Sequence, residues 1–295
     1  MNLDSYIAEK INLINDKLDK YLPDESEVPE LIHQSMRYSV FAGGKRLRPI
    51  LVIASSEAVG FNAEKVMPTA CALELIHTYS LVHDDLPAMD DDDYRRGKLT
   101  NHKVYGEATA ILTGDALLTK AFELIAFNAT LGINEKNIIK VLGEISSAAG
   151  SQGMVGGQVV DMQSENKSIG FDTLKYIHTH KTGDLFKASV RAGAILANAS
   201  DKQLAALTEY AEQLGLAFQI TDDILDVEGD AQVIGKAVGS DQKNQKSTYP
   251  SLFGIDQSKE MAYNSVSKAI NALDIFGSEA DRLRKIANYL TKRKV

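Results

Sequence analysis

Apolar residues recur every three or four positions through most of the chain, which is the spacing of one face of a helix. The pattern is clearest over residues 110–128, 138–149, 184–199 and 201–221. Ser200 and Asp201 are suitable residues to begin the last of these helices, because their side chains can cap free backbone N–H groups. No run of strict apolar–polar alternation is bounded by turn residues, so the sequence favours no β-sheet. We therefore predict an all-α protein.

Breaks that contain glycine separate these helices near residues 43–44, 150–157, 168–170 and 229–239. None resembles a long interdomain linker, and the chain has no low-complexity tract or fixed-period repeat. A length of 295 residues is compatible with one large domain or two small ones. We favour a single domain over residues 1–295, a large helical bundle around a central cavity.

Composition narrows the class of protein. The chain is 44% hydrophobic and 24% charged, as in an ordinary soluble globular protein. Its single cysteine, Cys71, excludes an intrachain disulfide and fits a reducing compartment. The first residues have neither the basic nor the apolar region of a signal peptide, and no apolar run approaches the roughly 20 residues that span a bilayer. We therefore expect a cytoplasmic protein without stable membrane insertion.

The formal net charge of −8 argues against general affinity for nucleic acid, but it is compatible with a small anionic substrate. Two aspartate clusters point to such a substrate. The first is Asp84-Asp85-Leu86-Pro87-Ala88-Met89-Asp90, running on to Asp93, and the second is Asp222-Asp223-Ile224-Leu225-Asp226. Carboxylates this close repel one another and need cations, and Mg²⁺ often combines one or two carboxylates with substrate phosphates. An enzyme that handles diphosphates is the first hypothesis.

The second cluster has regular helical geometry. Asp222 and Asp226 are four residues apart, on one face of a helix, and Asp223 lies about 100° around it. Like charges at this spacing destabilise a helix unless a cation is present. A solvated acidic helix end is the alternative, but the apolar neighbours Phe218 and Ile224 favour a metal site.

The first cluster is less regular. Asp84 and Asp90 are six residues apart, which in an ideal helix places them about 120° out of register. Pro87 cannot donate a helical hydrogen bond, so the helix should break or bulge there and could bring Asp90 back towards Asp84. We expect Asp84, Asp85 and Asp90 to be metal ligands, and Asp91 to Asp93 to form a solvated acidic loop.

Further motifs occur in a fixed order along the chain. They are Gly43-Gly44-Lys45-Arg46-Leu47-Arg48-Pro49, Gly114-Asp115-Ala116-Leu117, Gly157-Gln158 with Asp161, and Lys181-Thr182-Gly183. Together with the aspartate clusters they resemble the trans-isoprenyl diphosphate synthase family, most closely the short-chain bacterial farnesyl diphosphate synthases. One aspartate-rich motif alone would be a weak signal, whereas this ordered set over roughly residues 40–250 is specific. The resemblance implies the all-α isoprenoid synthase fold.

The resemblance also implies roles for individual residues. Three Mg²⁺ ions would be held through the substrate diphosphate and by Asp84, Asp85, Asp90, Asp222, Asp223 and Asp226. The allylic diphosphate would meet Arg95, Lys181, Lys236 and Lys246, and isopentenyl diphosphate would meet Gly44, Lys45, Arg48, His77 and Arg96. Guanidinium groups suit this task because their planar fork binds two phosphate oxygens at once. Without the resemblance, residues 45–48 would be interpreted as a solvated turn and His77 as a core histidine.

The implied reaction is ionisation, condensation and elimination. Diphosphate departs from the allylic substrate, the isopentenyl double bond attacks the carbocation, and a proton is then lost. Lys181, Thr182 and Gln219 match the residues that line the carbocation and would stabilise it through their dipoles. No Ser-His-Asp or Cys-His set stands out, and this reaction needs no nucleophilic side chain.

The product length rests on Tyr79, five residues and about 7.5 Å of helix before Asp84. In the family, a bulky aromatic residue at this position floors the tunnel that receives the growing chain. Helical geometry alone would have placed Ser80, not Tyr79, on the face of Asp84. The resemblance therefore predicts a fifteen-carbon product, farnesyl diphosphate, from isopentenyl diphosphate and dimethylallyl or geranyl diphosphate.

Several alternatives remain. The chain could be a geranylgeranyl or geranyl diphosphate synthase. A non-catalytic partner subunit of a prenyltransferase would be expected to lack part of an aspartate motif, and both are whole. A di-iron carboxylate protein would need two Glu-x-x-His pairs, whereas only Glu74 and His77 form one. The resemblance also implies a homodimer, although no stretch of sequence identifies its interface.

Overall fold

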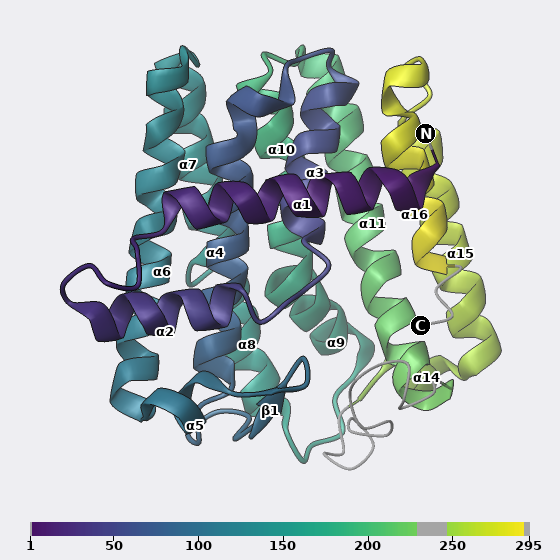
Figure 1. Cartoon of the computed structure of the whole chain (residues 1–295). Helices are drawn as coiled ribbons and strands as arrows, with labels where there is room; N and C mark the ends of the chain where they lie inside the picture. Colours follow the sequence, from purple (N-terminus) through teal and green to yellow (C-terminus); the bar gives the residue numbers. More distant parts are fainter. Residues whose placement is uncertain (1, 229–246, 292–295) are drawn as a thin grey trace. The chain divides into compact units, whose positions relative to one another are not determined.

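A computed structural model describes residues 2–228 and 247–291 of the chain. Nearly all of its regular structure is helical (Figure 1), so the predicted all-α class is confirmed. The chain separates into two compact units, one of Met1–Ile53 with Ala63–Ile138 and the other of Ala54–Asn62 with Ile139–Val295.

The first unit is built around two long helices. Its elements are α1 (Leu3–Tyr21), α2 (Glu30–Val40), the start of α3 (Leu47–Ala58), η1 (Ala63–Val66), α4 (Met67–Asp84), β1 (Tyr94–Arg95), β2 (Lys98–Leu99), α5 (Asn101–Tyr105), α6 (Glu107–Phe127) and η2 (Asn128–Leu131). Helices α4 and α6 lie side by side (Figure 1). Apolar residues occur on every face of α4, so it is buried along most of its length.

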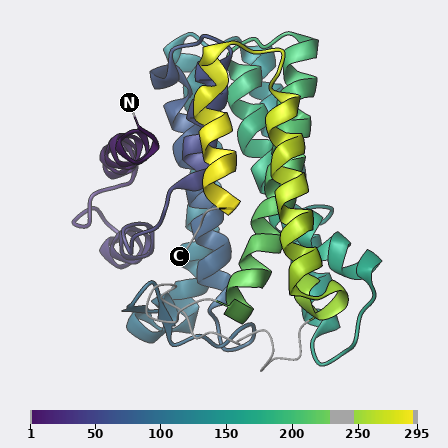
Figure 2. The same ribbon diagram turned by 90° about the vertical axis from the view of Figure 1, so that its right-hand side faces the viewer.

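The second unit contains the longest helix of the chain's described part. Its elements are most of α7 (Glu135–Ala149), then α8 (Met154–Ser164), α9 (Phe171–Ile177), the π-helical turn η3 (His178–Gly183), α10 (Asp184–Leu196), α11 (Asp201–Glu228), α14 (Tyr249–Phe253), α15 (Ile255–Ala272), η4 (Ser278–Ala280) and α16 (Asp281–Thr291). In Figure 2, α15 and α16 run beside α11. One core cluster joins α9, α11, α14 and α15 through Leu174, Ile220, Ile224, Tyr249 and Ala262.

The start of α11 agrees with the sequence prediction. Gln203 N–H donates to Ser200 Oγ over 3.3 Å, and Ser200 N–H donates to Gln203 Oε1 over 3.0 Å. These reciprocal bonds satisfy two backbone donors that a helix start otherwise leaves open. From there α11 continues without a break through the second aspartate cluster to Glu228.

A short hairpin departs from the prediction that the chain favours no β-structure. Strands β1 and β2 pair antiparallel, with Tyr94 opposite Leu99. The two residues between them, Arg96 and Gly97, have φ values of 54° and 75°, as a two-residue hairpin turn requires. Strands of two residues are too short to produce a visible alternation, which is why the sequence pattern missed them. The hairpin presents Arg95 and Arg96 consecutively at its tip.

Among the residues described, no helix combines the length and the hydropathy that crossing a membrane would require.

Candidate active site

The first aspartate cluster lies where α4 ends. The helix stops at Asp84, Asp85 caps it, and Pro87 follows in the turn. Asp90 N–H donates to the carbonyl of Asp84 over 2.8 Å, so the backbone returns to the helix end as predicted. Asp84 is half-buried and Asp90 is exposed. Carboxylates at the negative end of a helix are unfavourable by themselves, so this end of α4 favours a bound cation.

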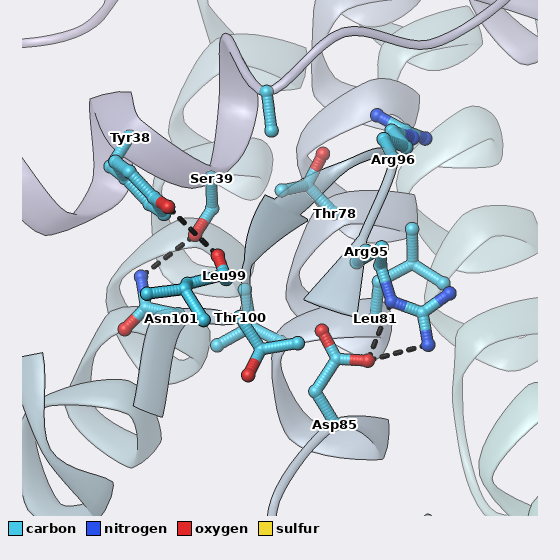
Figure 3. Close-up of a pocket in the computed structure, with 12 residues that line it drawn as sticks. Tyr38, Ser39, Thr78, Leu81, Asp85, Arg95, Arg96, Leu99, Thr100 and Asn101 are labelled. Atoms are coloured by element: carbon cyan, nitrogen blue, oxygen red, sulfur yellow. Dashed lines mark hydrogen bonds and ion pairs between the residues drawn. The ribbon is translucent and has the colours of Figure 1, made fainter. Parts of the chain in front are cut away.

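Asp85 differs from its neighbours because it is buried and paired. Both Nε and Nη2 of Arg95 lie 2.5 Å from Asp85 Oδ1 (Figure 3). Burial raises the pKa of Asp85, and Arg95 only partly offsets that rise. Burial by itself would lower the pKa of Arg95, but the hydrogen bond and charge of Asp85, together with the charges of Asp92 and Asp84, raise it. Asp85 therefore orients Arg95 at the hairpin tip.

The glycine-rich turn before α3 meets the same hairpin. Arg96 donates to the carbonyl of Gly43, and a Cβ on Gly44 would lie 2.6 Å from Arg96 Nη1. Gly44 also has a φ of 132°, which side chains other than glycine rarely allow. The structure thus brings Gly44 and Arg96 together, and it leaves Lys45 exposed beside them.

His77 and Arg48 add to this basic region. Burial lowers the pKa of Arg48 to about 10, with Arg96 acting in the same direction against Glu74. The pKa of His77 is lowered well below its ordinary value, first by burial and then by the arginines led by Arg48 and Arg96. A neutral imidazole in a positive field is suited to an anionic partner, whose charge would offset that of the arginines.

A pocket opens beside this region in the first unit, between α2, α4 and the hairpin. Its lining comprises Tyr38, Ser39, Ala42, Thr78, Leu81, Val82, Asp85, Arg95, Arg96, Leu99, Thr100 and Asn101. Tyr38 donates to the carbonyl of Leu99 over 2.8 Å and Asn101 donates to Ser39 over 2.7 Å (Figure 3), which ties the hairpin and α5 to α2. The buried Thr78 Oγ1 has no hydrogen-bond partner among the residues that the structure describes. A bound molecule or water could supply one.

The two chain-length candidates lie on α4 in different environments. Tyr79 is 6% exposed, and burial followed by the charge of Asp84 raises its pKa to about 12. Ser80 is half-buried, and its hydroxyl donates to the carbonyl of His77 over 3.0 Å. Ser80 is therefore bonded to its own helix, whereas Tyr79 places an aromatic ring in the packed interior.

In the second unit, Lys181 is fixed by a carboxylate that the sequence left without a role. Its Nζ lies 2.6 Å from Asp161 Oδ2. A Cβ on Gly157 would lie 2.2 Å from the backbone nitrogen of Lys181, so only glycine lets α8 approach η3 this closely. Thr182, also in η3, and Gln219, on α11, are both half-buried.

The three acids of the second cluster lie in unequal environments. Asp222 is exposed and Asp226 half-buried, whereas Asp223 is 7% exposed. Asp223 Oδ2 accepts the backbone N–H of Tyr249 over 2.9 Å, and His178 Nε2 lies 3.8 Å from its other oxygen. Asp223 thus ties α11 to the first residue of α14. Two further predicted ligands, Lys236 and Lys246, lie outside the described residues.

The donor atoms fit a hard divalent cation shared with a substrate. Within residues 2–228 and 247–291, no three His, Cys, Asp or Glu side chains converge as a complete metal site. Mg²⁺ seldom uses an all-protein cage and usually combines one or two carboxylates with phosphate oxygens and water. Asp84 and Asp90, joined by a backbone hydrogen bond, and Asp222 and Asp226, one turn apart on α11, carry the oxygen ligands that such a cation takes.

Sequence reasoning overlooked a buried ion pair beneath the basic region. Arg46 Nη1 lies 2.7 Å from Glu74 Oε1, and the same guanidinium donates to Asn15 Oδ1 and to the carbonyl of Val40. Glu74 lies in an otherwise apolar stretch of α4. A buried carboxylate needs a cation. An acid within that apolar stretch was therefore the sequence signal that could have predicted the ion pair.

Comparison with known proteins identifies the family of the chain. Residues 29–289 match the polyprenyl synthetase family. The chain is 48% identical to farnesyl diphosphate synthase of Micrococcus luteus, covering 96% of this chain and 95% of the relative. It is 47% identical to geranylgeranyl diphosphate synthase of Cyanophora paradoxa, covering 99% and 97%.

A solved structure gives the same result for the fold. The crystal structure of geranylgeranyl pyrophosphate synthetase from Pyrococcus horikoshii superposes with a TM-score of 0.89 at 33% identity, covering 99% of this chain and 98% of that one. With the family match over most of its length, the chain is a prenyltransferase that belongs to the polyprenyl synthetase family.

Proposed function

We propose that the chain is a Mg²⁺-dependent farnesyl diphosphate synthase, condensing isopentenyl diphosphate with dimethylallyl or geranyl diphosphate. The observation that carries this proposal is the basic region at the hairpin, where neutral His77 lies among arginines beside the aspartates that end α4. That combination suits a diphosphate and its cations. The family match extends through both compact units, which supports one functional domain over residues 1–295.

Each binding role is the one that the family resemblance implies, and the charge of each residue is compatible with it. Arg48, Arg96, Lys45 and His77, with the close approach allowed by Gly44, would bind isopentenyl diphosphate. Arg95, oriented by Asp85, would bind the allylic diphosphate together with Lys181, Lys236 and Lys246. Bidentate guanidinium contacts would hold the diphosphate oxygens in a fixed orientation.

Magnesium would supply Lewis-acid stabilisation of the departing diphosphate, held by Asp84, Asp85 and Asp90 and by Asp222, Asp223 and Asp226. The chain's own polar groups would stabilise the allylic cation. Asp161 balances the charge of Lys181, so that Lys181, Thr182 and Gln219 would present dipoles to the cation. The diphosphate itself would accept the final proton.

The product assay is direct. Purified protein is incubated with isopentenyl and dimethylallyl diphosphates, with and without Mg²⁺, and the products are separated by chain length. We expect a fifteen-carbon product with Mg²⁺ and no product after chelation by EDTA. Activity that survives complete chelation would contradict the metal requirement.

Tyr79 provides the second test. If its ring floors the cavity for the growing chain, Tyr79→Ala should lengthen the product, because the ring is buried and its removal leaves space. Gly143→Ala is a matched control, since a Cβ at Gly143 meets nothing within 4 Å. An unchanged product spectrum in Tyr79→Ala would refute this role.

A geranylgeranyl diphosphate synthase is the second candidate, favoured by the 47% identity to the Cyanophora paradoxa enzyme. A twenty-carbon main product from the unaltered protein would select it. The remaining proposals are a homodimer, no nucleic-acid partner and a cytoplasmic location.

A further inference from the structure

His83 contacts the residue that the proposed function uses to limit product length. It follows Tyr79 by four residues on α4, so the two side chains share a helix face. Their ring centroids lie 5.8 Å apart with the planes at 81°, an edge-to-face arrangement. None of the roles assigned above involves the His83 ring.

The His83 ring lies against α6 at two residues, Ile111 and Gly114, which together form a slot for it. His83 Nε2 lies 3.0 Å from the carbonyl oxygen of Ile111. A carbonyl can only accept, so Nε2 carries the proton. At Gly114, an added Cβ would lie 2.0 Å from His83 Nε2 and 2.4 Å from His83 Cδ2. The ring therefore rests directly on the α6 backbone, at a position that no residue larger than glycine allows.

We propose that His83, held in the slot formed by Ile111 and Gly114, is a positioning residue that fixes the Tyr79 ring and thereby limits product length. This inference rests on the proposed role of Tyr79. The Tyr79 ring is 6% exposed, so it can turn aside for a longer chain only if a neighbour yields. The bond of His83 to Ile111 on α6 opposes such a movement. The Gly114-Asp115 motif then has a physical purpose, because Gly114 admits the ring.

The test compares the ratio of the next longer product to the main product in His83→Ala, His83→Phe and the unaltered protein. An edge-to-face ring contact contributes enough to change such a ratio by about threefold or more. His83→Ala should therefore raise the ratio by about that factor. His83→Phe keeps a ring but lacks the bond to Ile111, so it should give an intermediate ratio.

Gly114→Ala probes the slot from the other side. The added Cβ overlaps the His83 ring and should displace it, which raises the same ratio. In a His83→Ala background the added Cβ has no ring to displace, so the double variant should match His83→Ala alone. Gly143→Ala, whose Cβ meets nothing within 4 Å, is the control for a glycine-to-alanine change in a helix.

The outcomes separate this inference from the proposed function. Ratios equal to that of the unaltered protein in both His83→Ala and Gly114→Ala would overturn the role of His83, whatever the main product is. A main product other than fifteen carbons would instead overturn the farnesyl assignment. Far-UV circular dichroism checks that each variant folds, and if His83→Ala does not, His83→Phe and Gly114→Ala decide by the same ratio.

Discussion

Two features of the surroundings of His77 oppose a positive charge on its imidazole. Burial removes the imidazole from water, and Arg48 and Arg96 act on it in the same direction. The folded protein therefore keeps His77 neutral under conditions where an exposed histidine would be protonated. An approaching anion would further offset the charge of these arginines, which is the physical link between this residue and a diphosphate substrate.

The pH dependence of stability should report this environment. The pKa of His77 is lowered in the folded state, so below about pH 6.5, the ordinary histidine value, the unfolded chain binds more protons there than the folded chain. The free energy of unfolding should then fall as the pH falls through that range. His77→Gln removes the proton site and should flatten this dependence. Urea denaturation at pH 7.5 and 5.5 gives the free energy of unfolding of both proteins. If that free energy changes equally with pH in the unaltered protein and in His77→Gln, the assigned environment is contradicted.

At the scale of elements, Arg46 joins three helices through one buried guanidinium. It contacts Glu74 on α4, Asn15 on α1 and the carbonyl of Val40 at the end of α2. Arg46 also has a φ of 48°, so the backbone turns sharply just before α3 begins. The neighbouring Lys45 and Arg48 belong to the proposed substrate pocket. The buried contacts of Arg46 fix the backbone turn that lies between these two residues.

Removing one member of the Arg46–Glu74 ion pair should lower the free energy of unfolding. Glu74→Ala leaves the guanidinium buried without its carboxylate, and such a loss typically destabilises by about 3–5 kcal/mol. The double variant Arg46→Met with Glu74→Leu removes both charges and should recover part of that loss. Asp93→Ala, which breaks an exposed pair with Lys103, is the control and should change the denaturation midpoint much less. A double variant no more stable than Glu74→Ala would show that the pair's charges are not the cause.

At the scale of the whole chain, the sequence predicts the features that depend on neighbouring residues. The helical period, the start of α11 at Ser200 and the return of the backbone after Pro87 are local, and the structure confirms them. Tertiary partners are different. Asp223 accepts a bond from Tyr249, 26 residues further along, and no local pattern signals that contact. The pairing of Asp85 with Arg95 depends in the same way on a hairpin too short to predict.

We infer that the expected homodimer packs through exposed apolar residues near the start of α6. Ile111 and Leu112, near the start of this helix, are 46% and 60% exposed. A helix that is apolar beyond the face it buries within its own chain usually packs against a second partner, and in a homodimer that partner is a second copy of the chain.

Placing a charge at Leu112 should separate two copies that pack through the start of α6. Leu112→Glu buries an unpaired carboxylate in the dimer but exposes it in the monomer, so the mass measured by light scattering after size exclusion should halve. Tyr263→Glu, at a residue 66% exposed on α15, is the matched control and should stay dimeric. An unchanged mass in Leu112→Glu would exclude this surface, and a monomeric unaltered protein would exclude the homodimer. Because the carbonyl of Ile111 also holds His83, a monomer with an altered product ratio would further indicate that the partner copy supports the slot.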